Sequence, residues 1–264
     1  MTKQIFPLAL GGLAIGTTEF IIMGLLPDVA KDLGVSIPIA GHLISAYAFG
    51  VVVGAPILVA LSSKFPPKNI LIVYMILFTL FNALSIVAPD YNTLLMSRFL
   101  AGLPHGAFFG VGTIVAIKLS KKGKEAQAVS SMFTGLTLAI LLLVPFLTYI
   151  GHNTSYKWAF LIVSLLGIFT ILALIKFMPK LKSLKTVTFK EEIEFFLTFK
   201  AWHIILIVAI GFGGLFAWFS YIAPLLINIS KFPPSSISYL MLVAGVGMVV
   251  GNILGGYLAD KKDP

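Results

Sequence analysis

Residues 16–30 read GTTEFIIMGLLPDVA and place one acid, Glu19, inside an apolar run that covers 6–26. About 20 mainly apolar residues are enough to cross the hydrocarbon core of a membrane as a helix. A charged side chain in such a helix costs roughly 3 kcal/mol, so we expect it to face the interior of a helix bundle or a water-filled path. The stretch therefore predicts a membrane helix that carries a functional or structural acid.

The composition of the whole chain agrees with this interpretation. Of the 264 residues, 58% are hydrophobic and only 11% are charged, whereas a soluble domain carries about 25% charged residues. The sequence thus predicts an all-α membrane protein, a polytopic bundle of about eight transmembrane helices. Besides 6–26, the predicted spans are 41–62, 70–88, 93–117, 127–149, 157–178, 202–228 and 236–259.

The lysines are distributed unevenly over the loops. If the N-terminus lies inside, fifteen lysines fall on that side, and only Lys31, Lys157 and Lys231 fall on the other. Cytoplasmic loops carry such an excess of positive charge. We expect a multi-pass protein of the plasma membrane, the bacterial inner membrane, with both termini cytoplasmic. The net charge of +9 is explained by these loops, so no nucleic-acid partner is predicted.

Several classes of protein are disfavoured by what the sequence lacks. There is no cysteine, so disulfides and thiol chemistry are excluded. The sequence has no P-loop, no dinucleotide-binding glycine pattern and no metal-spaced set of histidines. We expect no enzyme activity, no cofactor and no metal.

An internal repeat divides the chain. At an offset of 197 residues, VVVGAPILVALSSK (51–64) aligns without a gap with MVVGNILGGYLADK (248–261), and Pro27 meets Pro224. Six helices separate equivalent positions, so the two copies are parallel, as in one architecture of secondary transporters.

The repeat predicts an N-terminal six-helix half at 1–178 and the first two helices of an incomplete C-terminal half at 202–264. Between them, 179–201 is a lysine-rich cytoplasmic linker. Its segment VTFKEEIEFFLTFK is either an amphipathic helix at the membrane surface or a partly ordered connection.

Three stretches carry a family resemblance: GTTEFIIMGLLPDVAKDLGVS (16–36), LLMSRFLAGLPHGAFFGVG (94–112) and GYLADK (256–261). They resemble the major facilitator superfamily and, within it, the bacterial arabinose/sugar-efflux permease group of the drug/proton antiporter branch. The resemblance covers nearly the whole chain, as the first eight of that family's twelve helices. It implies a transporter that exports a small solute, a sugar or an amphipathic drug, by alternating access, with proton entry as a driving force.

Three polar residues in spans are candidates for the proton and substrate pathway. Glu19 would be the protonation site; alternatively, it is a neutral acid hydrogen-bonded to Thr17, Thr18 or another helix. The resemblance links Arg98, the only arginine, to proton coupling, although an arginine near a helix start can also reach the lipid headgroups. His105 lies two turns after Arg98 on nearly the same face and would either modulate the site or donate a structural hydrogen bond.

Two aromatic and two amide side chains in the spans are also of interest. Trp218 and Tyr221 would contact substrate by stacking, or else belong to an aromatic belt at the membrane interface. Asn82 and Asn252 are explained by hydrogen bonds between helices.

Small residues and a charged loop complete the candidate set. Glycines at a spacing of four residues predict close helix packing: Gly102, Gly106 and Gly110 in one span, and Gly247, Gly251 and Gly255 in another. The family's gating loop is matched by VALSSKFPPK (59–68), with Ser63 at the aspartate position and Lys64 and Lys68 as its basic residues. The second copy of this loop has Asp260 and Lys261.

Two other functions remain open on sequence alone. The chain is either a transporter or a truncated, non-transporting membrane protein, such as a gene fragment or a subunit of a split transporter. The expected partners are membrane lipid, a small-molecule substrate, protons and a missing C-terminal segment. An intramembrane enzyme would need clustered catalytic groups, and only Glu19, Arg98 and His105 are available.

Overall fold

The computed structural model describes residues 3–62, 64–182, 194 and 197–261. Eight segments of this part are long and apolar enough to cross a membrane, which confirms the predicted eight-helix membrane bundle. In chain order the helical segments are α1 (Phe6–Asp32), α2 (Ile37–Ser62), α3 (Pro67–Val87), α4 (Tyr91–Leu119), α5 (Glu125–Leu138), η1 (Ala139–Leu143), α6 (Val144–Asn153), α7 (Lys157–Phe177), α9 (Phe199–Ser220), α10 (Ile222–Pro224), η2 (Leu225–Ile229), η3 (Pro234–Ser236) and α11 (Ile237–Lys261).

Two of the spans are interrupted. The fifth span runs as α5, the π-helical segment η1 and α6, and Pro145 stands in the first turn of α6. In the seventh span, helix α9 ends at Ser220, and a second π-helical segment, η2, follows Pro224. A proline removes a backbone donor, and its ring clashes with the carbonyl four residues earlier. For Pro145 that residue is Leu141, inside η1, and for Pro224 it is Ser220, where α9 ends.

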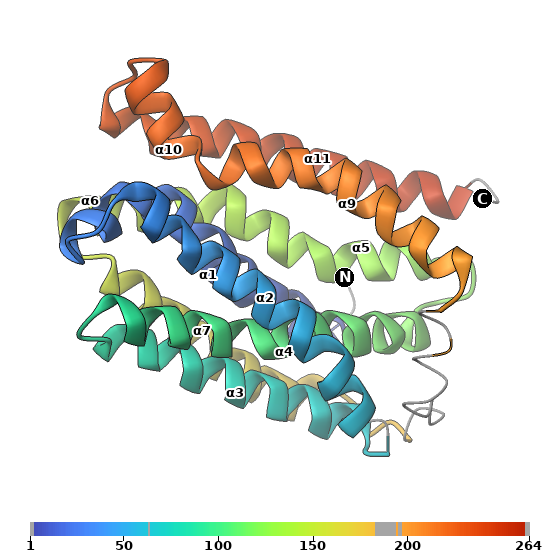
Figure 1. The fold of residues 1–264 in the computed structure, drawn as a ribbon. Coiled ribbons are helices and arrows are strands. Elements are labelled where there is room, and N and C mark those ends of the chain that lie inside the picture. Colours follow the sequence, from blue (N-terminus) through green and yellow to red (C-terminus); the bar gives the residue numbers. More distant parts are fainter. Residues whose placement is uncertain (1–2, 63, 183–193, 195–196, 262–264) are drawn as a thin grey trace.

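Helix α1 forms the centre of the bundle. In its most apolar 18-residue window 83% of the residues are buried, compared with 6% for α9 and 17% for the span that contains α11. Helix α1 packs against α5 and α7, α2 packs against α4, and α3 packs against both α4 and α7. In Figure 1, α9 and α11 lie on one side of the bundle, and both ends of the chain lie toward the same end of it.

The contact between α2 and α4 depends on glycines. A methyl group at Gly50 would collide with the carbonyl oxygen of Phe99, and one at Gly54 would collide with the backbone of Leu103. On α4, Gly102 meets the carbonyl of Tyr47 in the same way. The missing side chains let the two backbones approach closely.

The other predicted packing glycines behave differently from one another. Gly106 packs against Ala55 and Val51 of α2, as expected for a packing position. In the part of the chain that the structure describes, nothing within 4 Å would meet a Cβ at Gly110, Gly247, Gly251 or Gly255. Helix α11 instead approaches the fifth span through Gly245 and Gly256, which lie on a different face of the helix. The expectation that Gly110, Gly247, Gly251 and Gly255 make close helix contacts is therefore corrected.

Candidate functional site

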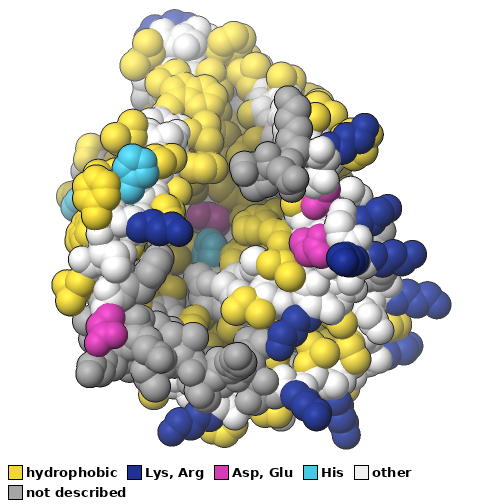
Figure 2. Space-filling model, turned by 90° about the vertical axis from the view of Figure 1, so that its right-hand side faces the viewer, with side chains coloured by type: hydrophobic (Ala, Val, Ile, Leu, Met, Phe, Trp, Pro, Cys, Tyr) yellow, Lys and Arg dark blue, Asp and Glu magenta, His cyan; other side chains and the backbone are white. Residues whose placement is uncertain are grey.

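A cavity of about 400 Å³ lies between the first six spans and helices α9 and α11. Figure 2 shows the molecule from the end at which the C-terminus lies. The molecule is hollowed there, with hydrophobic walls and with one histidine and one acidic side chain deep inside. The residues that line the cavity are Glu19, Phe20, His105, Phe133, Leu136, Thr137, Phe212, Leu215, Phe216, Phe219, Met248, Gly251 and Asn252. Two of the three pathway residues predicted from sequence, Glu19 and His105, are therefore on its wall.

The third pathway residue, Arg98, lies behind the wall. Its side chain is 0% exposed, so it does not reach the lipid headgroups. Nη1 donates to the hydroxyl of Thr18 at 2.8 Å and Nη2 donates to the carbonyl of Thr18 at 3.0 Å. The guanidinium carbon lies 4.4 Å from the ring centre of Tyr47, close enough for a cation–π contact. Arg98 thus joins α4 to α1 and α2.

This arginine is part of a chain of polar contacts across three spans. The hydroxyl of Thr18 donates to the side-chain oxygen of Asn82, and the amide of Asn82 donates to the carbonyl of Phe78 at 2.8 Å. The prediction that Asn82 makes a hydrogen bond between helices is confirmed. Buried groups that satisfy one another in this way hold their helices in one arrangement.

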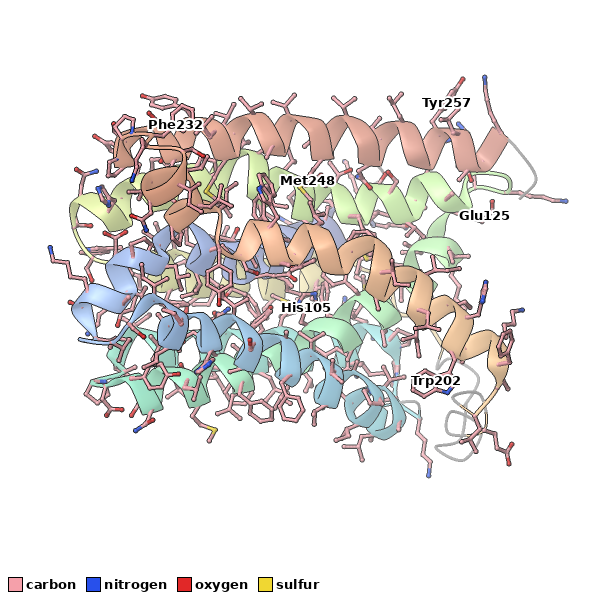
Figure 3. All side chains as sticks on the ribbon, turned by 45° about the horizontal axis from the view of Figure 1, so that its top comes forward. His105, Glu125, Trp202, Phe232, Met248 and Tyr257 are labelled. Atoms are coloured by element: carbon pink, nitrogen blue, oxygen red, sulfur yellow. The ribbon has the colours of Figure 1, made fainter. Side chains whose placement is uncertain are left out.

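His105 is held by a neighbour on α2. Its Nδ1 lies 3.0 Å from the hydroxyl oxygen of Tyr47, and its ring packs 5.2 Å from that of Phe109. Figure 3 shows His105 and Met248 near the middle of the bundle, whereas Trp202 and Tyr257 both lie toward one end of it. Tyr47 therefore contacts both of the pathway candidates on α4, Arg98 and His105.

Glu19 is the acid of the cavity. It follows Thr18 directly, so its position on α1 is fixed by the neighbour that Arg98 binds. Among the described residues no group donates a hydrogen bond to its carboxylate and none forms an ion pair with it within 4 Å. Its carboxylate therefore remains available to a proton or to a solute in the cavity.

On the opposite wall, the side chains that come from α9 are all apolar. Phe212, Leu215, Phe216 and Phe219 face the cavity, at the spacing of one face of a helix. The ring of Phe216 stacks on Phe20 of α1 with the ring centres 5.8 Å apart. Aromatic side chains from both sides of the cavity thus meet directly.

The predicted substrate contacts, Trp218 and Tyr221, do not lie on the cavity. Trp218 is 45% exposed and Tyr221 is 42% exposed, and the hydroxyl of Tyr221 lies beside Gly41 of α2. Two residues along a helix turn a side chain by about 200°, so Trp218 points away from the face that carries Phe216. Both residues lie off this cavity, and their contact with substrate stays a prediction.

Helix α11 joins the fifth span through polar groups. The amide of Asn252 donates to the carbonyl of Ser130 at 3.1 Å and to the hydroxyl of Thr134 at 3.2 Å, which confirms its predicted hydrogen bonds between helices. Near the end of α11, the carboxylate of Asp260 accepts from the backbone N–H groups of Ala126 and Gln127, both at 2.9 Å. Asp260 therefore caps the start of α5.

The loop after α2 is the first copy of the gating motif. Lys68 donates from Nζ to the carbonyls of Ile175 and Met178, both at 2.7 Å, and so caps the end of α7. Lys64 is exposed, and Ser63 lies outside the described residues. In the second copy, Lys261 lies with its Nζ 4.6 Å from the ring centre of Tyr257. The expected amphipathic helix of the linker also falls mostly outside the described residues.

Several residues of this site were missed by sequence reasoning. Tyr47 and the phenylalanines of the cavity gave no signal in a chain with 22 phenylalanines and 8 tyrosines. Thr18 was considered as a partner of Glu19, whereas the structure gives it to Arg98. A partner 80 residues away in sequence cannot be found from spacing alone.

Comparisons with known proteins agree with this architecture. The family model of the Major Facilitator Superfamily matches residues 8–264. The inner membrane transport protein YdhP of Escherichia coli (strain K12) is 43% identical over 255 residues, which is 97% of this chain and 66% of YdhP. A probable sugar efflux transporter of Helicobacter pylori is 31% identical over 261 residues, which is 98% of this chain and 66% of that protein.

A solved structure shows the same fold. The proton:xylose symporter XylE has a TM-score of 0.74 at 12% identity, over 97% of this chain and 68% of XylE. The chain spans about two thirds of the length of the curated relatives that it matches. These relatives are membrane transport proteins and not enzymes. The chain belongs to the major facilitator superfamily.

Proposed function

We propose that this protein exports a small solute across the bacterial inner membrane by alternating access, driven by proton entry. The observation that carries the proposal is the cavity between the first six spans and α9–α11, in which Glu19 is the one carboxylate among the described lining residues. Transporters of this architecture bind solute at the interface of their halves, near the midplane of the membrane. Residues 1–178 would be one half and 202–264 the first two helices of the other, and the lysine-rich loops would lie in the cytoplasm.

Glu19 is the protonation site in this proposal. A carboxyl group inside a span is costly as an anion unless it is paired, and in the described structure it has no partner of its own. Binding a proton from outside and releasing it inside would let Glu19 exchange that proton for solute. Arg98 would hold α1 and set the position of Glu19 through Thr18. His105, tied to Tyr47, would adjust the same wall.

Asp260 and the start of α5 would form the cytoplasmic gate. The carboxylate of Asp260 on α11 accepts two backbone hydrogen bonds at the start of α5, which is the positive end of that helix. These bonds join α11 to the N-terminal half. Movement of α11 away from α5 would break them. Asp260→Asn should therefore increase the labelling of a cysteine placed in the cavity from the cytoplasmic side, and unchanged labelling would remove Asp260 from the gate.

The direct test is flux in reconstituted vesicles under an imposed pH gradient. A fluorescent amphipathic dye and radiolabelled L-arabinose would serve as solutes. We expect gradient-dependent flux of one of them, loss of that flux in Glu19→Gln, and normal flux in Asp32→Asn, which changes another acid of α1 outside the cavity. Flux that persists in Glu19→Gln with unchanged gradient dependence would contradict the role of Glu19.

A second candidate is that this chain is one part of a split transporter, or a non-transporting fragment. The open glycine face of α11 and the greater length of the relatives favour it. Flux that appears only after co-reconstitution with a separate chain of four further spans would support this candidate over the first.

A further inference from the structure

We infer that a groove between α2 and α3, at the lysine-rich end of the bundle, binds an anionic phospholipid. One acyl chain would lie in the groove, and the phosphate would lie beside Lys64 and the start of α3. The groove shares no lining residue with the cavity that contains Glu19. The inference therefore goes beyond the proposed function and concerns a surface that the transport cycle does not use as its solute site.

The groove is a recess of about 280 Å³ on the outside of the bundle. Buried or half-buried residues line its floor, namely Leu58, Ile70 and Tyr74, while its other apolar members, Leu61, Phe65 and Val73, are exposed. Both α2 and α3 are long and apolar enough to span a membrane. In a bilayer the groove would therefore meet acyl chains and not water.

Local contacts fix the shape of the groove. The hydroxyl of Tyr74 donates to the carbonyl of Leu58 at 2.8 Å, which joins α3 to α2 at the floor. Pro66 and Pro67 begin α3, and the proline ring restricts the backbone angle φ. A recess that exists before binding can hold an acyl chain without first being ordered, which lowers the cost of binding.

One end of the groove is polar and carries positive charge. Asn69 lines the groove in the first turn of α3, and Lys64 directly precedes Phe65. Lys64 is exposed and forms no ion pair within 4 Å among the described residues. The sequence contains no Asp or Glu between Asp32 and Asp90, so neither helix nor the loop between them carries an acid that would repel an anion.

The neighbouring helix adds to this charge. Lys68 donates to two carbonyls at the end of α7, which places that end beside the start of α3. Lys176 and Lys180 lie at the same end of α7 and are exposed. The acids of the helices at this end of the bundle, Glu125 and Asp260, belong to α5 and α11, and α11 lies across the bundle from α3 in Figure 1.

A phospholipid with a net negative charge matches both parts of this surface. Its acyl chain suits the apolar groove, and anionic headgroups are attracted to lysines near the membrane surface. A zwitterionic lipid offers the same chain without net charge, whereas a free phosphate offers the charge without a chain. The internal repeat gives a contrast, because its second copy has Asp260 where the first copy has Ser63. We therefore assign the lipid to the first copy.

Equilibrium binding to the purified full chain in detergent, measured by native mass spectrometry, tests the inference. The probes are dioleoylphosphatidylglycerol, dioleoylphosphatidylcholine, which has the same chains, and sn-glycerol 3-phosphate, which has none. We expect phosphatidylglycerol to bind at least about 10-fold more tightly than phosphatidylcholine, and sn-glycerol 3-phosphate not to bind. This comparison needs no variant, so it is independent of the effect of any substitution on folding.

Two pairs of variants test the charge at the groove. Lys64→Gln should weaken phosphatidylglycerol binding about 5-fold, whereas Lys122→Gln, in the loop between α4 and α5, should leave it unchanged. Asn69→Asp should also weaken it about 5-fold, whereas Asn92→Asp, at the start of α4, should have no effect. Both asparagines lie in the first turn of a helix, where an acid is favourable, so both variants should fold.

A third pair tests the groove itself. Val73→Trp would fill it and should remove the preference for phosphatidylglycerol over phosphatidylcholine. Leu172→Trp adds the same ring at an exposed position of α7 and should keep that preference. A circular dichroism spectrum and a single elution peak would establish that each variant is folded.

The inference would be overturned by equal affinity for the two lipids, or by a preference that Lys64→Gln, Asn69→Asp and Val73→Trp all leave unchanged. Binding of sn-glycerol 3-phosphate as tight as that of phosphatidylglycerol would replace the lipid by a free phosphate. A dimer that Val73→Trp dissociates would assign the groove to a second copy of the chain, and either result would also overturn the inference. None of these measurements uses flux, so failure of the proposed transport would leave the lipid site standing.

Discussion

The two sides of the cavity are built by different physical means. On one side, Arg98, Thr18 and Asn82 connect buried polar groups across three helices, and Tyr47 holds His105. On the other side, α9 contributes only apolar side chains to the cavity, and most of its length is exposed. A hydrogen-bonded wall has one geometry, whereas an apolar wall can adapt to different shapes. In the proposed function, the first wall would position the proton site and the second would contact the body of the solute.

The internal repeat gives a matched comparison of the same two sides. Gly50 and Gly54 of α2 press against α4, while Gly247 and Gly251, at the equivalent positions of α11, have no neighbour within 4 Å among the described residues. The same small-residue pattern is therefore filled on one side and open on the other. What makes a glycine structural is the backbone opposite it and not the motif around it.

The largest expected effect on stability comes from adding a side chain at the two equivalent glycines, Gly50 and Gly247. Gly50→Leu should destabilise the folded protein by about 3 kcal/mol, because the new side chain meets the carbonyl of Phe99 and the backbone cannot yield. Gly247→Leu should change stability by less than about 0.5 kcal/mol. Thermal unfolding in detergent would measure both. Equal losses would show that the glycine face of α11 is also packed.

A second substitution sharpens the account of the polar wall. Arg98→Lys keeps the positive charge but loses the planar guanidinium group, which donates two hydrogen bonds to Thr18. We expect a loss of about 1–3 kcal/mol in stability, together with slower proton-driven flux. A matched change on the other wall, Leu215→Met, should cost less than about 1.5 kcal/mol. If Arg98→Lys were as stable and as active as the wild type, the fork would have no positioning role.

The smallest expected effect on stability comes from the N-terminal caps of the helices that form the two walls. Helix α4 starts at Asp90, whose carboxylate accepts from the backbone N–H of Thr93 at 2.9 Å, whereas η3, ahead of α11, has no side-chain cap. The hydrogen bond from the Thr93 backbone lowers the pKa of Asp90, which lies just before the span. Asp90 therefore adds stability above its unfolded-state pKa, and this is lost as the pH falls through its lowered folded pKa.

Asparagine also caps a helix but does not titrate. The difference in Tm between wild type and Asp90→Asn should therefore be constant near neutral pH and should shrink as the pH falls below about 4. Unfolding curves at several pH values would measure it. A difference that grows in acid would contradict the lowered pKa.

The sequence predicted the spans well, because length and hydropathy decide them. Their ends were harder to predict. Helix α1 continues through Pro27 to Asp32, where the prediction ended at 26, since neighbouring helices can satisfy the groups that a proline frees. The span predicted at 202–228 is broken after Ser220, next to Pro224.

The candidate site was predictable only in part. Glu19 and His105 were found because polar side chains are rare in spans, and both line the cavity. The facing of α9 could not be predicted, because a helix that is apolar all round has no periodic pattern to distinguish its lipid face from its cavity face. Trp218 was chosen for its chemistry, and the helix turns it away. The contact of Arg98 with Thr18 depends on tertiary packing.

The most direct test of the central claim, that the cavity is a solute path reached by water, is cysteine labelling. The chain has no cysteine, so single cysteines can be introduced at two positions. Met248 lies on the cavity. Phe169 lies on an exposed face of the span α7, which would meet lipid and not water in a membrane. A thiolate forms only where water reaches it. We predict that a membrane-impermeant methanethiosulfonate labels Met248→Cys about 10-fold faster than Phe169→Cys in reconstituted vesicles. Equal, slow labelling of both in folded protein would contradict the claim.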